Sequence, residues 1–232
     1  LGFINKNIRV LVDDRATKEN ILSRINKMID EAKNGDFLIF HFSGHGSQIR
    51  DRRDNDELSD HLDELICPYD MDWDGTYISD DMLYDTFQNL KDGVHLEVIL
   101  DSCHSGTATR SLAPQGSYES GLADIKDRYL APPFDIMSRS EGEEGILKSK
   151  KLFSSLKVKK LNHVLWAGCM DRQTSADAYI SGSYNGAFTY YFCKCIRDTS
   201  MRVTRSELRR LVATALSYNR YTQIPQLECE DV

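Results

Sequence analysis

The spacing of hydrophobic and polar residues divides the first hundred residues into alternating strands and helices. Short apolar runs predict strands, and apolar residues three and four positions apart predict helices. One helix is expected to begin after Thr17 and end at Gly35, and a second to begin after Ser79 and end near residue 90, because Thr and Ser are preferred N-caps. The strands are expected at residues 8–12, 37–42, 65–67 and 95–101.

This pattern is lost over residues 105–160, which are rich in Gly, Pro and Ser, and we expect a flexible linker there. Order returns with a buried strand at 161–168 and a helix near 186–198. Thr204 and Glu207 form a capping-box motif that starts another helix, and a last strand is expected at 226–229. The alternation predicts an α/β fold, with a parallel or mixed sheet covered by helices on both faces.

Two polar residues follow the ends of predicted strands, His45 after "DFLIFHFSG" and Cys103 after "LEVILDS". Functional groups collect at the carboxyl edge of such sheets, so parallel neighbouring strands would bring these two side chains to one edge. An imidazole can take the proton of a thiol and so activate it as a nucleophile. The backbone amides of Gly46 and Cys103 are candidate donors to a developing oxyanion. Alone, each residue is better explained as a turn histidine or a half-buried thiol; together they favour catalysis.

Composition narrows the classes of protein that remain. The net charge is −7 over 232 residues, which does not suggest nucleic-acid binding, and no apolar run is long enough for a membrane span. The six cysteines contain no C-x-x-C pair, so neither a zinc site nor a disulfide framework is indicated. We expect reduced thiols, a cytoplasmic location and no organic cofactor.

The motifs "HFSGHGSQ" and "DSCHSG", with Cys103 58 positions after His45, closely resemble those of metacaspases and orthocaspases, the caspase-like cysteine peptidases. The stretch 168–192 resembles their small-subunit region. The resemblance implies a caspase-hemoglobinase fold, with a large-subunit-like region at 1–106, a linker at 107–160 and a small-subunit-like region at 161–232. It also implies peptide-bond hydrolysis by a Cys103–His45 dyad.

The resemblance places Asp101, Ser43 and Asp177 in the substrate pocket. Because an acidic pocket prefers a cation, we expect cleavage after Arg, then Lys, and not after Asp. We also expect the enzyme to cut itself in the linker, where flexible basic residues lie. These basic residues are Arg110, Lys126, Arg128, Arg139, Lys148, Lys150 and Lys151.

Many acidic residues lie in 51–64 and 70–81, and such a charge run is often only a solvated surface. The resemblance instead implies a calcium site at Asp60, Asp80 and Asp81. An acid that the family often has seven positions after the nucleophile is Arg110 here, which weakens that expectation.

The resemblance further implies a central strand that would precede residue 1. We therefore expect either a processed fragment or a separate fragment or chain that supplies this strand. We expect protein substrates and a monomer. The alternatives are another chemistry on the same dyad, a catalytically idle scaffold, or a calcium-binding interaction module; intact His45 and Cys103 favour the peptidase.

Overall fold

The computed structural model describes residues 2–50, 62–103, 126–138, 163–170, 173 and 175–229. Asp60, Arg110 and most of the predicted linker lie outside these residues.

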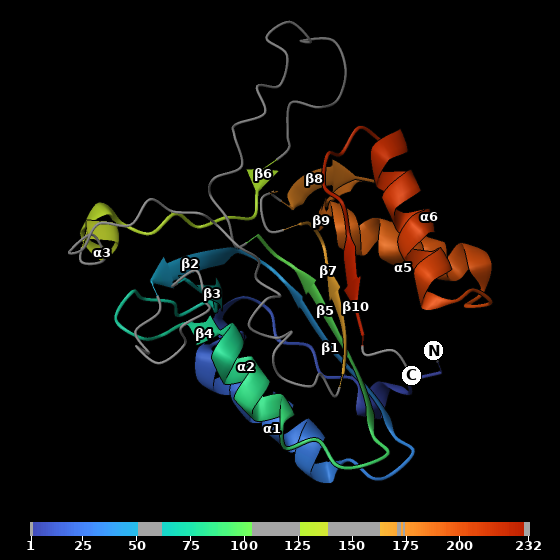
Figure 1. Ribbon diagram of the computed structural model, residues 1–232, viewed down its shortest axis with the longest axis horizontal. Coiled ribbons are helices and arrows are strands. Elements are labelled where there is room, and N and C mark those ends of the chain that lie inside the picture. Colours follow the sequence, from blue (N-terminus) through green and yellow to red (C-terminus); the bar gives the residue numbers. More distant parts are fainter. Residues whose placement is uncertain are drawn as a thin grey trace, which may run out of the picture.

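A four-stranded sheet forms the centre of the molecule, in the order β1, β5, β7, β10 (Figure 1). β1, β5 and β7 are parallel, and β10 is antiparallel to β7. All four strands were predicted, and the mixed sheet is confirmed. They are β1 (Phe37–Ser43), β5 (His95–Asp101), β7 (Val164–Ala167) and β10 (Gln226–Glu228).

Helices cover both faces of this sheet, as predicted. α1 (Lys18–Glu31) and α2 (Asp80–Phe87) pack on one face, and α5 (Ala187–Thr199) and α6 (Arg205–Tyr218) pack on the other (Figure 1). Side chains of β5 alternate between the two cores: Val98 and Leu100 join the core of α1 and α2, and Ile99 joins the core of α5 and α6. This burial on both faces explains the apolar run of Val98, Ile99 and Leu100 in this strand.

Local capping signals fix where the helices begin. Thr17 Oγ1 accepts a hydrogen bond from the Asn20 amide, and Ser79 Oγ accepts one from the Met82 amide. Both bonds of the predicted capping box between Thr204 and Glu207 are present at the start of α6. The first two helices end three to four residues earlier than predicted, at Glu31 and Phe87.

Two small antiparallel sheets stand beside the central one. Of their strands, the sequence predicted only β3. In Figure 1, β6 and β8 lie at the upper end of the central sheet, where the arrow of β5 ends. The first sheet holds β2 (Gly46–Arg50), β3 (Leu62–Ile66) and β4 (Ile78–Ser79); the second holds β6 (Lys126–Asp127), β8 (Ala176–Ile180) and β9 (Ser183–Gly186). A short helix, α3 (Phe134–Ser138), follows β6.

The predicted strand at 8–12 is wrong. The segment is extended but pairs with no strand in the described residues, and Ile8, Val10 and Val12 remain exposed. A strand needs a neighbour to satisfy its backbone donors and acceptors. Residues 8–12 do not pair with β1, which is the edge strand of the described central sheet.

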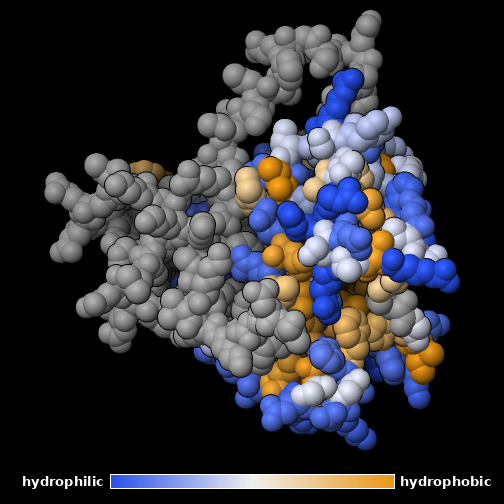
Figure 2. Space-filling model, turned by 45° about the vertical axis from the view of Figure 1, so that its right-hand side comes forward, coloured by the Kyte–Doolittle hydropathy of each residue, from blue (hydrophilic) through white to orange (hydrophobic). Residues whose placement is uncertain are grey.

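Apolar residues also reach the surface of the molecule. Figure 2 shows several of them gathered between hydrophilic residues on the face that it displays. Across the part of the chain that the structure describes, no helix is both long enough and apolar enough to cross a membrane.

Candidate active site

The register of β1 and β5 brings the predicted catalytic residues to one edge. Ser43 pairs with Asp101, and the Gly44 amide donates to the Asp101 carbonyl at 3.2 Å. His45 and Cys103 each follow two residues after this pair. The expectation that both lie at the same carboxyl edge is therefore confirmed.

The thiol of Cys103 is fully buried and contacts the backbone of Ser175. Its Sγ accepts a hydrogen bond from the Ser175 amide and lies 3.3 Å from the Ser175 carbonyl oxygen. A hydrogen bond with Cys103 and burial raise the pKa of the neighbouring Cys169 thiol well above its usual range. The imidazole of His45 is exposed and forms no hydrogen bond with the thiol within the described residues. The structure thus places the two residues together at the edge without joining them.

Asp101 is a fully buried carboxylate with several hydrogen-bond donors. Its Oδ1 accepts from Ser175 Oγ at 2.5 Å. Its Oδ2 accepts from the amide of Thr189 at 2.9 Å and from its hydroxyl at 2.6 Å. A buried carboxylate is costly unless donors or a cation compensate it, and these contacts fix its position beside Cys103.

The guanidinium of Arg128 lies among the three residues that were predicted to form the substrate pocket. Its Nη1 donates to Ser43 Oγ at 2.5 Å and to the Asp101 carbonyl at 2.9 Å, and lies 3.8 Å from Asp101 Oδ2. Its Nη2 donates to Asp177 Oδ1 at 3.1 Å. The structure therefore brings Ser43, Asp101 and Asp177 together around one cation.

The two amides predicted as oxyanion donors point at one carbonyl oxygen. The Arg128 carbonyl accepts from the Gly46 amide at 2.9 Å and from the Cys103 amide at 3.3 Å. Two backbone donors that converge on one oxygen, beside a thiol, can stabilise negative charge on that oxygen.

Ser175, Thr189 and Gln223 contact or support the candidate site residues and were not predicted from the sequence. The Gln223 side chain accepts from the Ala176 amide at 2.9 Å and donates to the Gly168 carbonyl at 2.8 Å, which holds the segment around Ser175 in place. Ser175 and Thr189 both lie in the stretch 168–192 that carried the resemblance, so that stretch was the available signal.

Of the predicted acidic region, Asp63 and Glu64 lie on β3 and Asp80 and Asp81 lie at the start of α2, while residues 51–61 are outside the described residues. Burial first, and then the neighbouring carboxylates of Asp63 and Asp81, raise the pKa of Asp80 to about 7. Asp80 Oδ1 is buried without a hydrogen-bond partner among the described residues. Those residues contain no group of three or more His, Cys, Asp or Glu side chains arranged to hold a metal ion, and Asp60 lies outside them.

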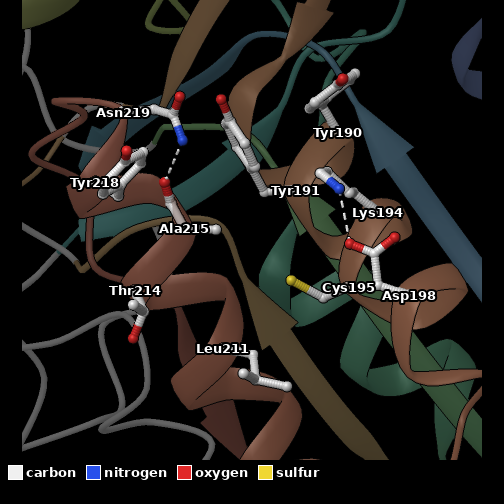
Figure 3. Close-up of a pocket in the computed structure, with 10 residues that line it drawn as sticks. All are labelled: Tyr190, Tyr191, Lys194, Cys195, Asp198, Leu211, Thr214, Ala215, Tyr218 and Asn219. Carbon is white, nitrogen blue, oxygen red and sulfur yellow. Dashed lines mark hydrogen bonds and ion pairs between the residues drawn. The ribbon is translucent and has the colours of Figure 1, made fainter.

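A cavity between α5 and α6 lies away from Cys103 and includes none of the predicted site residues (Figure 3). Tyrosines line it, and its charged residues, Lys194 and Asp198, pair with each other at 2.7 Å. Beside Cys103, the guanidinium of Arg128 lies against Ser43 and Asp177.

The fold and the site define an α/β protein with a thiol, an imidazole and two convergent amides at one sheet edge. A sequence profile of the metacaspase peptidase C14 domain matches residues 4–111. Metacaspase-1 of Ajellomyces capsulatus is 30% identical over 253 residues, which cover 98% of this chain and 69% of the relative. Metacaspase-1 of Pyricularia oryzae is 34% identical over 234 residues, which cover 92% of this chain and 57% of the relative. The chain therefore belongs to the metacaspase family.

The chain spans about three-fifths of the length of most of these curated relatives, for instance 58% of Metacaspase-1A of Aspergillus clavatus. A crystal structure of a Geobacter sulfurreducens protein matches with a TM-score of 0.63 at 24% identity, covering 95% of this chain and 76% of that chain. The central sheet, with helices on both faces, is the caspase-like sandwich that the resemblance implies.

Proposed function

We propose that this chain is a cysteine endopeptidase that cleaves peptide bonds after Arg or Lys. The observation that carries the proposal is the set of contacts that Ser43, Asp101 and Asp177 make with a guanidinium beside Cys103. The ammonium of Lys can reach the same carboxylates. It lacks the planar guanidinium, whose two terminal nitrogens can face both carboxylates at once, so Arg is preferred. An Asp side chain would place a third negative charge in the pocket and is rejected.

The mechanism follows from the residues at the carboxyl edge of β1 and β5. His45 takes the proton of Cys103, and the thiolate attacks the carbonyl carbon of the bound Arg or Lys residue. The amides of Gly46 and Cys103 stabilise the oxyanion that forms. His45 then protonates the leaving amine, and water hydrolyses the thioester. For this to begin, the Cys103 thiol has to leave the Ser175 backbone and meet the imidazole.

Hydrolysis of matched fluorogenic peptides ending in Arg, Lys or Asp tests this function, with calcium and with chelator, beside Cys103→Ala. We expect hydrolysis after Arg and Lys that is lost in the variant. Hydrolysis after Asp would overturn the assignment of the pocket, but the assignment of Cys103 as the nucleophile would stand. No hydrolysis under any condition would favour an idle caspase-like scaffold.

We further propose that calcium binds at the acidic region. The buried Asp80 Oδ1 has no hydrogen-bond partner in the described residues, and two further carboxylates lie near enough to raise the pKa of its side chain. Such oxygens suit a hard cation, which would neutralise their mutual repulsion. Asp80 and Asp81 would hold the ion together with Asp60, and its role would be to order the region between β3 and α2.

A further inference from the structure

We propose that the bond between Arg128 and Tyr129 is the bond at which this chain cuts itself, and that residues 126–130 fill the active site as an internal substrate until then. This inference rests on the proposed peptidase function. It selects one bond among the basic residues of the linker, all of which the sequence left as equal candidates.

The side chain of Arg128 is held as a specific substrate residue would be. It is only 9% exposed, although it is a long charged residue in a predicted flexible linker. Its two terminal nitrogens contact Ser43, Asp101 and Asp177, and the carboxylates of Asp101 and Asp177 face it from β5 and β8. The guanidinium therefore occupies the pocket that the proposed function assigns to the residue before the cut.

The backbone of Arg128 identifies the bond. Its carbonyl oxygen accepts from both the Gly46 and the Cys103 amides. In acyl transfer, the carbonyl that such donors hold is the one that the nucleophile attacks. The bond that breaks is therefore the one that joins this carbonyl carbon to Tyr129 N.

The residues on both sides of this bond are held as an added strand. Lys126 and Asp127 pair antiparallel with β8, and the Arg128 amide donates to the Ser175 carbonyl at 3.1 Å. Beyond the bond, the Leu130 amide donates to the Gly46 carbonyl at 2.9 Å, and Ser47 Oγ donates to the Leu130 carbonyl at 2.7 Å. Strand addition of this kind gives a peptide affinity through its main chain, while a side-chain pocket gives specificity.

The cut conserves atoms and protons. Cys103 gives its proton to His45 as Sγ bonds to the Arg128 carbonyl carbon, and His45 gives that proton to Tyr129 N as the carbon–nitrogen bond breaks. Water then hydrolyses the thioester, which leaves a carboxylate on Arg128 and restores the thiol of Cys103. The products are a chain that ends at Arg128 and a chain that begins with the amine of Tyr129.

This arrangement also predicts how the site is regulated. While residues 126–130 are bound, an added peptide has to compete with a segment of the same chain, whose effective concentration is on the order of millimolar. After the cut, each half is held by fewer contacts and can leave. Hydrolysis of added peptides should therefore show a lag that ends as the chain is cut.

The test is incubation of the full chain followed by intact-mass analysis and N-terminal sequencing of the fragments. Wild type should give a new N-terminus at Tyr129. Arg128→Gln should slow this cut by about 100-fold or more, because the pocket carboxylates lose their cation. Lys126→Gln is the matched control: Lys126 is exposed, its Nζ lies over the Tyr184 ring at 5.3 Å, and its replacement should leave the cut in place.

Hydrolysis of an added Arg peptide by the same proteins separates this inference from the proposed function. We expect Arg128→Gln to hydrolyse the peptide without a lag. If wild type hydrolyses the peptide but is cut only elsewhere or not at all, the inference is overturned and the function stands. If no protein hydrolyses any peptide or is cut, both are overturned. The wild-type termini decide the question even if Arg128→Gln does not fold.

Discussion

Two carboxylates, the fully buried Asp101 and the half-buried Asp80, have opposite surroundings in this molecule. Asp101 accepts hydrogen bonds from Ser175 and Thr189 and faces the guanidinium of Arg128. Asp80 has one buried oxygen without a partner in the described residues, and its charged neighbours that raise its pKa are acids.

The difference shows how the same side chain can serve recognition or regulation. Donors that surround a buried carboxylate fix the position of its oxygens, as binding of a cationic side chain would require. A carboxylate that is desolvated and lies beside other carboxylates has a raised pKa, so protons or a cation that neutralise it are favoured. The comparison supports the proposals that the Asp101 region recognises a cationic side chain and that the Asp80 region binds calcium.

The largest effect is expected from Asp101→Asn. The variant removes the buried charge, and an amide cannot accept all the hydrogen bonds that the two oxygens of Asp101 receive. We expect kcat/KM for Arg peptides to fall by about 1,000-fold, since buried polar groups would be left unpaired. Equal rates for the variant and wild type would show that Asp101 does not act in the pocket.

A smaller but more selective effect is expected from Gly186→Ala. A methyl group at Gly186 would overlap Asp101 Oδ2 and would lie 2.8 Å from Cζ and Nη1 of Arg128. We expect a loss of about 1–3 kcal/mol in stability from the overpacking, measured by denaturant unfolding. Arg peptides should lose more activity than Lys peptides, because the methyl group displaces the planar guanidinium; an equal loss for both would contradict this placement.

Asp177→Asn should have a milder effect, because the side chain of Asp177 is about one-third exposed and contacts one nitrogen of Arg128. We expect kcat/KM for Arg peptides to fall by about 10-fold at low ionic strength, and by less at high salt. Steady-state rates over a salt series measure this. A loss as large as that of Asp101→Asn would place Asp177 in the buried part of the pocket.

The smallest effect on peptide specificity, and a distinct effect on stability, is expected from Asp80→Asn. The pKa of Asp80 is raised from 3.8 to about 7 in the folded protein. The folded protein therefore holds this proton more tightly than the unfolded chain does. This stabilises the fold fully below pH 4, and the stabilisation is lost as the pH rises to 7. In chelator, wild type should lose up to about 4 kcal/mol relative to the variant between pH 4 and pH 8.

Comparing the two proteins removes the contribution of other groups, such as His163, whose pKa burial lowers to about 4. Urea unfolding at each pH gives both free energies. Calcium should restore wild type above pH 7 and leave Asp80→Asn unchanged. If the free energies of unfolding of the two proteins change with pH in the same way without calcium, folding does not raise the pKa of Asp80.

Signals that act within one turn or along one strand could be predicted from the sequence. The capping box of Thr204 and Glu207 lies within four residues, and the apolar run within 95–101 predicted a strand. The strand at 8–12 failed because its pattern describes only its own side chains, and a strand forms only when a neighbour pairs with it.

The residues of the candidate site also fall into those that could be placed from the sequence and those that could not. His45 and Cys103 could be placed at one edge because neighbouring parallel strands end there, and the glycines around His45 marked the turn, whereas only the resemblance placed Ser43 and Asp101 together. The donors to Asp101 come from β8 and α5, which reach it only through the packing of the whole domain. Nothing in the sequence distinguishes Arg128 from the other basic residues of the linker, since its place depends on the backbone of residues 126–130 pairing with β8 and contacting Gly46.

We propose above that Ser43, Asp101 and Asp177 bind a cationic side chain beside the thiol of Cys103. The most direct measurement is kcat/KM, with enzyme already cut at its linker, for peptides of the chain's own sequence Lys-Asp-Arg-reporter, Lys-Asp-Lys-reporter and Lys-Asp-Asp-reporter. We expect the order Arg, then Lys, with Asp below detection, and no hydrolysis by Cys103→Ala. Hydrolysis of the Asp peptide at a rate equal to or above that of the Arg peptide would contradict it.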